Sequence, residues 1–181
     1  FLLKKVQERQ RLIDENNYWR SKVDGNGDLQ EPIMNKRSKM YKIYENVKKI
    51  AQSKASVLIQ GESGTGKEII AQSIYLQSKR NTGPFIKVIC AALSERSLES
   101  ELFGHVKGAF TGADRDKPGL LETANGGTLF LDELTEMPMS LQAKLLRVIQ
   151  DGVVRRVGSE QADAVVDVRF VSAMNRDPEE A

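Results

Sequence analysis

A glycine-rich segment ending in a lysine carries the clearest chemical meaning in this sequence. It reads GESGTGKE over residues 61–68 and matches the pattern G-x-x-x-x-G-K. In such a loop the glycines let backbone N–H groups surround phosphate oxygens. The lysine reaches the β- and γ-phosphates, and the following helix points its positive end at the same anions. The predicted nucleotide-binding residues of this phosphate loop are Gly61, Glu62, Ser63, Gly64, Thr65, Gly66, Lys67 and Glu68.

The final position of the pattern departs from its usual form. That position is normally Ser or Thr, whose hydroxyl binds Mg²⁺, and here it is Glu68. A glycine-rich turn with a chance lysine is the alternative interpretation. The apolar strand expected before the loop and the helix expected after it favour phosphate binding.

Two acids follow a later apolar segment, TLFLDE, at residues 128–133. A strand ending there would place both carboxylates at its carboxyl end, beside the phosphate loop. Asp132 is predicted to hold Mg²⁺, directly or through water, and Glu133 to orient and deprotonate the attacking water. An acidic pair at a strand end also arises by chance. In combination with the phosphate loop it indicates a chain that binds and hydrolyses ATP.

Asn175 is the third catalytic candidate, in the segment SAMNRD after the last apolar run. A polar side chain there could sense the γ-phosphate or position water. The alternative is an asparagine that caps a turn before Asp177 and Pro178.

The elements that must position these residues alternate between strand and helix patterns. Strands are predicted at 57–60, 84–90, 128–133 and 168–174, and helices at 38–53, 69–78, 97–103 and 140–150. A small hairpin is expected just before the fourth strand. Such alternation predicts an α/β fold with a parallel sheet covered by helices on both faces.

Composition is that of one globular domain. The chain has 181 residues, 40% of them hydrophobic and 29% charged, and a net charge of +2. No run is long enough for a membrane helix, and no signal peptide opens the sequence. The single cysteine forms no internal disulfide, so a cytoplasmic location is the default expectation. The mildly basic N-terminal part is interpreted as a solvated helical face rather than a nucleic-acid site.

The first residues differ from the rest. Residues 1–22 hold no Gly or Pro, and Leu2, Val6 and Ile13 follow an imperfect heptad spacing. We therefore expect a linker helix within 1–27 that could form a short coiled coil. A single helix packed on the core is the open alternative. The glycines and acids that follow mark a boundary, with the core domain predicted at 28–181.

The segment GHVKGAFTGAD, residues 104–114, has too many glycines for a helix and is predicted to be a loop. Phe110 and Thr111 supply one apolar ring and one hydroxyl between small residues. Taken alone, this could be a surface turn whose aromatic side chain folds back into the core, or an exposed contact. His105, the only histidine, is interpreted as structural.

Five segments in order, GESGTGKE, ESELFGHVKGAFTGAD, GGTLFLDE, LLRVIQDG and NRD, resemble the central AAA+ domain of bacterial enhancer-binding proteins. These are ATP-driven activators of RNA polymerase carrying sigma-54, and the resemblance covers residues 32–181. It implies a P-loop AAA+ core using ATP and Mg²⁺, and a homo-oligomer that passes from dimer to hexamer. The GAFTGA loop would contact sigma-54 through an exposed tip; its residues are Gly108, Ala109, Phe110, Thr111, Gly112 and Ala113. Glu68 is usual in this family.

The resemblance also implies parts outside this chain. A segment supplying arginines to the neighbouring subunit and a helical lid would follow Ala181, so the core is expected to be truncated before the lid. Neither Arg155 nor Arg156 matches those arginines. Residues 1–181 alone are therefore expected to hydrolyse ATP poorly. DNA binding would belong to a further domain.

Two positions depart from the family pattern. Ile89 stands in VICAAL where the family usually has an asparagine that bonds the catalytic glutamate, and Met174 stands where a threonine is usual. An apolar side chain makes no such bond. These departures support an alternative function, a nucleotide-binding assembly switch with little hydrolysis.

Overall fold

The computed structural model describes residues 39–175. The chain divides into two units, 1–44 and 45–181. All described residues belong to the second unit except the beginning of one helix. The linker helix expected within 1–27 lies outside the described residues. Over the described range, no helix is both long enough and apolar enough to cross a membrane.

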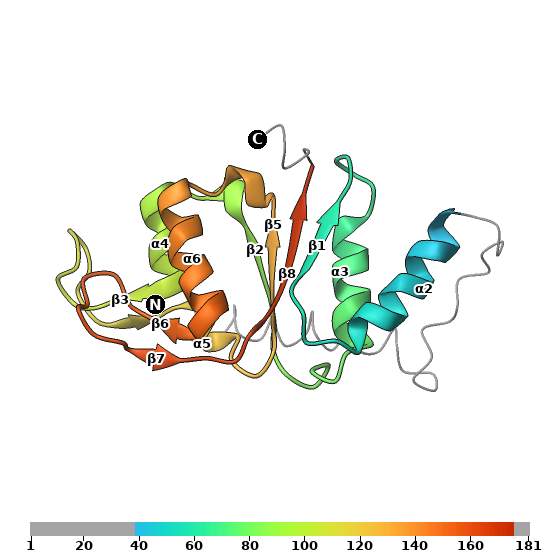
Figure 1. The fold of residues 1–181 in the computed structure, drawn as a ribbon. Helices are drawn as coiled ribbons and strands as arrows, with labels where there is room; N and C mark the ends of the chain where they lie inside the picture. Colours follow the sequence, from blue (N-terminus) through green and yellow to red (C-terminus); the bar gives the residue numbers. More distant parts are fainter. Residues whose placement is uncertain (1–38, 176–181) are drawn as a thin grey trace, which may run out of the picture. The chain divides into compact units, whose positions relative to one another are not determined.

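Four parallel strands form the central sheet of the second unit, in the order β1-β8-β5-β2 (Figure 1). They are β1 (Val57–Gln60), β2 (Phe85–Ile89), β5 (Thr128–Asp132) and β8 (Arg169–Met174). The predicted strands are confirmed, with ends that agree to within about one residue. The two central strands β5 and β8 are buried along most of their length, because helices cover them on both sides.

Helices cover both faces of the sheet, as the alternating pattern predicted (Figure 1). They are residues 45–51 of α2 (Lys39–Ala51) and α3 (Lys67–Leu76) on one side, and α4 (Glu95–Phe103), α5 (Leu120–Thr123) and α6 (Met139–Asp151) on the other. Successive residues of β5 alternate between the two cores. Phe130 packs with Ile74 of α3, whereas Leu129 and Leu131 pack in the cluster that contains Leu141 of α6.

Two helices begin earlier than the sequence indicated. α3 begins at Lys67 rather than Ile69, and α4 at Glu95 rather than Ser97. In the first case Gly66, with φ of 86°, turns the chain directly into the helix. The first turns of both helices carry polar side chains, so the apolar periodicity used for prediction could not locate their starts.

Short strands surround the predicted loop at residues 104–114. β3 (Gly104–His105) pairs antiparallel with β4 (Lys117–Pro118), which the sequence did not predict. The expected hairpin is confirmed by the antiparallel pair β6 (Val153–Val154) and β7 (Ala164–Val165). Two short 3-10 turns, η1 (Cys90–Ala92) and η2 (Leu134–Glu136), follow β2 and β5.

A buried arginine fixes the end of α2 to the sheet. Arg169 at the start of β8 is 2% exposed, and its guanidinium donates to the carbonyls of Ala51 at 2.9 Å and Ile50 at 2.7 Å. These are the last carbonyls of α2, where a positive charge is favourable. Burial lowers the pKa of Arg169 from its ordinary value. The contact holds the end of α2 at the amino end of the central strand β8.

Candidate functional site

The phosphate loop joins β1 to α3 and takes the shape its glycines permit. Gly64 and Gly66 have φ of 77° and 86°, a left-handed backbone that residues with a Cβ rarely adopt. The Thr65 hydroxyl donates to the Glu62 carbonyl at 2.8 Å and closes the loop from within. The amide of Ile70 donates to the carbonyl of Gly66, so α3 starts directly at the loop. The amide groups of its first turn are then available to an anion.

Lys67 already lies over this loop. Its ammonium group donates to the carbonyl oxygens of Gly61 at 2.9 Å and Glu62 at 2.8 Å. These contacts place the positive charge of Lys67 at the loop. Binding of phosphate by this lysine stays a prediction.

Glu68, at the position where a hydroxyl residue is usual, has a partner within the protein. Its carboxylate pairs with the ammonium of Lys87 on β2 at 2.7 Å. Sequence reasoning missed this contact, because nothing in the local pattern links residues on different elements. The ion pair explains how an acid can stand beside a phosphate-binding loop without facing the phosphates unpaired.

Asp132 and Glu133 lie at the carboxyl end of β5, where the chain is strained. Glu133 has φ of 54° and is the one non-glycine residue with a positive φ among those described. Such a conformation costs about 1–3 kcal/mol and is found preferentially at functional sites. The amide of Glu133 donates to the Asp132 carboxylate at 3.0 Å. Both side chains are half-buried, so they remain accessible to a ligand.

Cys90 follows β2 directly, and its thiol is buried. Burial, followed by the negative charges of Asp132 and Glu133, raises the pKa of Cys90 to about 12. The thiol is therefore protonated at neutral pH and unsuited to nucleophilic chemistry. Ile89, the residue before it, pairs with Asp132 across the sheet and is 40% exposed. An isoleucine can form no side-chain hydrogen bond with the neighbouring acids.

The end of β8 reaches the same edge of the sheet. Met174 pairs with Gln60 of β1, and its carbonyl accepts a hydrogen bond of 3.2 Å from the amide of Gly61. Asn175 follows at once and is exposed. The parallel strands thus bring the phosphate loop, the acid pair and Asn175 to one edge. Whether the Asn175 side chain senses a phosphate stays a prediction.

These residues fit a nucleotide carrying its own metal ion. Within residues 39–175, no three His, Cys, Asp or Glu side chains gather into a site that could hold a metal alone. Mg²⁺ in phosphoryl-transfer sites typically uses one or two carboxylates together with substrate phosphates. Asp132, at the same end of the sheet as the phosphate loop and separated from it by β8, can supply such a carboxylate.

The GAFTGA loop is closed by its own backbone. The amide of Gly108 donates to the carbonyl of Ala113 at 2.8 Å, and the amide of Ala113 to the carbonyl of Phe110 at 2.9 Å. At its base the amide of Lys107 donates to the Asp116 carboxylate at 2.7 Å. Gly108 and Gly112 have φ of 82° and 95° with open space around them. Glycine is thus required here by backbone conformation rather than by crowding.

The expected exposure of the loop tip is only partly correct. Thr111 and Gly112 are exposed, but Phe110 is half-buried and Ala113 is buried. The phenyl ring of Phe110 lies 4.9 Å from the ring of His105. An apolar ring gains by leaving water wherever a neighbouring surface offers contact, and here β3 provides it. The structure matches neither alternative fully, because the Phe110 ring is half-buried against His105 and, among the described residues, belongs to neither hydrophobic core cluster.

The hairpin packs against the GAFTGA loop. The amide of Val106 donates to the carbonyl of Val157 at 3.1 Å, and a Cβ on Gly158 would lie 2.7 Å from the Cβ of Ala109. There is no room for any side chain at Gly158, whose φ is also positive at 81°. The two segments therefore touch through backbone and small residues.

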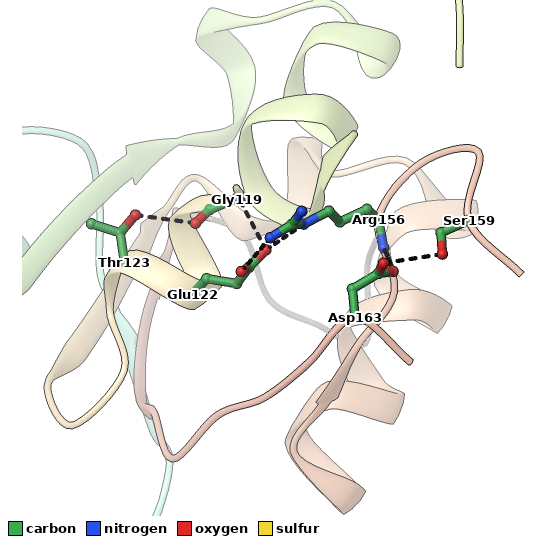
Figure 2. Close-up of polar contacts among 6 residues, drawn as sticks. All are labelled: Gly119, Glu122, Thr123, Arg156, Ser159 and Asp163. Carbon is green, nitrogen blue, oxygen red and sulfur yellow. Dashed lines mark hydrogen bonds and ion pairs between the residues drawn. The ribbon is translucent and has the colours of Figure 1, made fainter. Parts of the chain in front are cut away.

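An ion pair ties the hairpin to the short helix α5, as Figure 2 shows. The guanidinium of Arg156 donates to both carboxylate oxygens of Glu122, at 2.9 and 2.8 Å. The amide of Arg156 donates to the Asp163 carboxylate at 2.8 Å, which also accepts from the Ser159 hydroxyl. Both paired side chains are mostly buried. The sequence carried no signal for this pair, because its members are far apart and belong to different elements.

The Glu122–Arg156 pair should make stability depend on pH. The hydrogen bond from Arg156 lowers the pKa of Glu122 below its ordinary value of 4.5. A depressed folded-state pKa contributes stability that is present above the unfolded pKa and lost as the pH falls through the folded one. The free energy of unfolding of the parent should therefore fall as Glu122 becomes protonated. Glu122→Gln cannot titrate at this position, so its free energy of unfolding should fall less between about pH 6 and about pH 3, as measured by urea unfolding. Glu160→Gln, an exposed hairpin substitution, should keep the wild-type profile; equal profiles for both variants would contradict the prediction.

The sequence matches one protein-family model and resembles several known proteins. The family model described as the sigma-54 interaction domain matches residues 33–181. The chain is 48% identical over 185 residues to the regulatory protein LuxO of Vibrio vulnificus (strain YJ016), covering 98% of this chain and 41% of that protein. It is 57% identical over 145 residues to the regulatory protein AtoC of Escherichia coli (strain K12), covering 80% and 31%.

The fold has a matching solved structure. NtrX from Brucella abortus in complex with ATP superimposes with a TM-score of 0.72 at 33% identity, over 99% of this chain and 38% of that one. The chain thus spans about a third to two fifths of the length of these relatives.

Proposed function

The chain belongs to the sigma-54 interaction domain family of sigma-54-dependent transcriptional activators, and from this membership we propose that it hydrolyses ATP to move the GAFTGA loop against sigma-54. The observation that carries the proposal is that the phosphate loop, the strained acid pair and the end of β8 meet at one sheet edge. ATP is the proposed nucleotide because a 33% identical structure, NtrX, is described as its complex with ATP.

Lys67 and the amides at the start of α3 would bind the phosphates. To reach them, the Lys67 ammonium must exchange its contacts with the carbonyls of Gly61 and Glu62 for phosphate oxygens. The exchange replaces two neutral acceptors by charged ones and is favourable. Asp132 would hold Mg²⁺, which supplies neutralisation of the phosphate charge when bound.

Glu133 would act as the general base. A water oxygen attacks the γ-phosphorus, its proton passes to the Glu133 carboxylate, and the bond between the γ-phosphorus and the bridging oxygen of ADP breaks. The strained backbone at Glu133 holds this carboxylate at the end of β5 rather than along the strand. That strain supports the role assigned to it.

Chain continuity supports a connection between the nucleotide and the GAFTGA loop. The hairpin that contacts the loop leads through β7 into β8, and β8 ends at Met174, bonded to the phosphate loop. A displacement of β8 on hydrolysis would be carried to the hairpin, which Arg156 ties to α5 just after β4. We propose that this is how nucleotide state alters the loop, in a homo-oligomer whose neighbouring subunits complete the sites.

A nucleotide-binding assembly switch with little hydrolysis is the second candidate. The observation that favours it is Ile89, an apolar residue directly opposite Asp132. Isoleucine has no hydrogen-bonding side chain, so the side chain of residue 89 cannot restrain the carboxylates of Asp132 and Glu133. In this case nucleotide binding would control assembly, and the loop would have no role in remodelling.

The GAFTGA loop distinguishes these functions. We expect the full-length protein to capture sigma-54 in the presence of ADP and aluminium fluoride, a mimic of phosphoryl transfer, and not with ADP alone. Thr111→Ala removes an exposed hydroxyl at the loop tip and should abolish capture while nucleotide-dependent assembly, measured by ultracentrifugation, is kept.

The matched control is Thr82→Ala, at an exposed threonine in the connection before β2, which should capture sigma-54 normally. Nucleotide-dependent assembly without capture by the unaltered protein would overturn the proposed function and favour the switch.

A further inference from the structure

The phenyl ring of Phe110 is held between two side chains. The imidazole of His105 meets it edge-on, with ring centroids 4.9 Å apart and planes inclined by 65°. The guanidinium carbon of Arg96 lies over the phenyl ring at 4.9 Å from its centroid. A cation within about 6 Å of an aromatic centroid is attracted by the negative face of the ring. Phe110 is therefore seated by an aromatic contact and a cationic one.

Several contacts hold His105 in place. His105 is 8% exposed, and its Nδ1 is 2.8 Å from the hydroxyl of Ser100, which is also buried. Its backbone pairs with Lys117 in β4 and forms a bridge with Val157 of the hairpin. A residue held by so many contacts acts as a fixed wall against which the phenyl ring rests.

The arginine side is different. Arg96 stands in the first turn of α4 and its side chain is exposed. Within residues 39–175, the interaction that the structure gives it is the one with Phe110. An exposed arginine is not needed to fill the core. The Arg96 side chain, unlike that of His105, can therefore move away from the Phe110 ring without disturbing the core.

We propose that Arg96 is a positioning residue that keeps Phe110 folded against His105 and so controls the release of this side chain to sigma-54. The second half of the proposal rests on the proposed function; the first does not. A partner cannot contact the ring face that lies under the guanidinium, so binding requires the Arg96 contact to break. A cation held over a ring at an exposed position shifts such an equilibrium by about two- to fivefold.

Hydrogen exchange tests the positioning role without nucleotide or sigma-54. We expect Arg96→Gln to accelerate exchange of the Ala113 amide, which is bonded to the Phe110 carbonyl, by about two- to fivefold. Arg147→Gln, at an exposed arginine of α6, makes the same change in charge and should leave that amide at the wild-type rate. An equal rate in the two variants would overturn the proposal.

A double substitution separates the ring contact from a general loosening of α4. In a Phe110→Leu background, which lacks the aromatic ring, Arg96→Gln should add no further acceleration. An acceleration as large as in the parent would show that Arg96 acts on the loop without the ring and would contradict the proposal. Unchanged thermal unfolding of Arg96→Gln is expected, since the side chain is exposed.

Sigma-54 capture tests the consequence. With ADP and aluminium fluoride, Arg96→Gln should reach half-maximal capture at about two- to fivefold lower protein concentration than the parent, because release of Phe110 costs less. Faster exchange with unchanged capture would overturn the claim that Phe110 release limits binding. Absence of capture by the parent would overturn the proposed function, while the exchange result would still support the positioning role.

Discussion

Replacing Glu133 by glutamine is expected to lower ATP turnover about 10²–10⁴-fold while leaving ATP binding nearly unchanged. The amide is close in shape to the carboxylate, but it cannot accept the proton of the attacking water. Glu133 lies at the end of β5 with a left-handed backbone, beside Asp132 and at the same edge as the phosphate loop. Its substitution should therefore affect the chemical step alone.

The measurement is steady-state phosphate release by the full-length protein, together with ATP affinity by calorimetry. Glu160→Gln, in the exposed part of the hairpin, is the control for loss of one carboxylate and should turn over ATP at the parent rate. Parent-like turnover of Glu133→Gln would remove Glu133 from the mechanism. A parent protein whose own turnover is at background would instead favour the assembly switch, for which Ile89 is the structural argument.

Lys67→Ala is expected to weaken ATP binding about ten- to hundredfold, in contrast to the Glu133 substitution. The ammonium lies at the phosphate loop and donates to the carbonyls of Gly61 and Glu62. Without it, the backbone amides remain but the charge that balances the phosphates is lost. Turnover should fall as a consequence of binding.

Calorimetric titration with ATP measures this effect, and Lys79→Ala supplies the control, since Lys79 is an exposed lysine in the turn after α3. Lys79→Ala should bind ATP as the parent does. Equal affinities for the parent and Lys67→Ala would mean that nucleotide binds elsewhere. The pattern expected of the two functional variants is opposite: binding without hydrolysis for Glu133→Gln, and little binding for Lys67→Ala.

Local signals determined most of the architecture. The four strands and the phosphate loop could be predicted because each depends on neighbours in sequence. Buried parallel strands are continuous apolar runs, and a backbone with φ of 77° and 86° at Gly64 and Gly66 requires glycine. The placement of Asp132 and Glu133 followed as well, since a strand of known direction puts its last residues at a known edge.

The resemblance to enhancer-binding proteins added the GAFTGA loop to this prediction, and membership of the family is confirmed. The expected exposure of the loop tip is only partly correct, because Thr111 is exposed and Phe110 is half-buried. Six residues of loop sequence contain nothing that indicates a wall for Phe110 to rest on. That wall is formed by His105 of β3, and Arg96 of α4 lies over the ring.

Only the tertiary structure decided the contacts between distant elements. Glu68 forms an ion pair with Lys87, and Glu122 forms one with Arg156. Arg169 donates hydrogen bonds to the last carbonyls of α2. Each pairing depends on the sheet order and on helices packing on both faces, which bring together side chains that no sequence window contains. The sequence by itself determined which groups could bind and cleave ATP, because that chemistry depends on local backbone and residue type. How the loop is held depends on packing between elements, which only the tertiary structure shows; its release through Arg96 is our proposal.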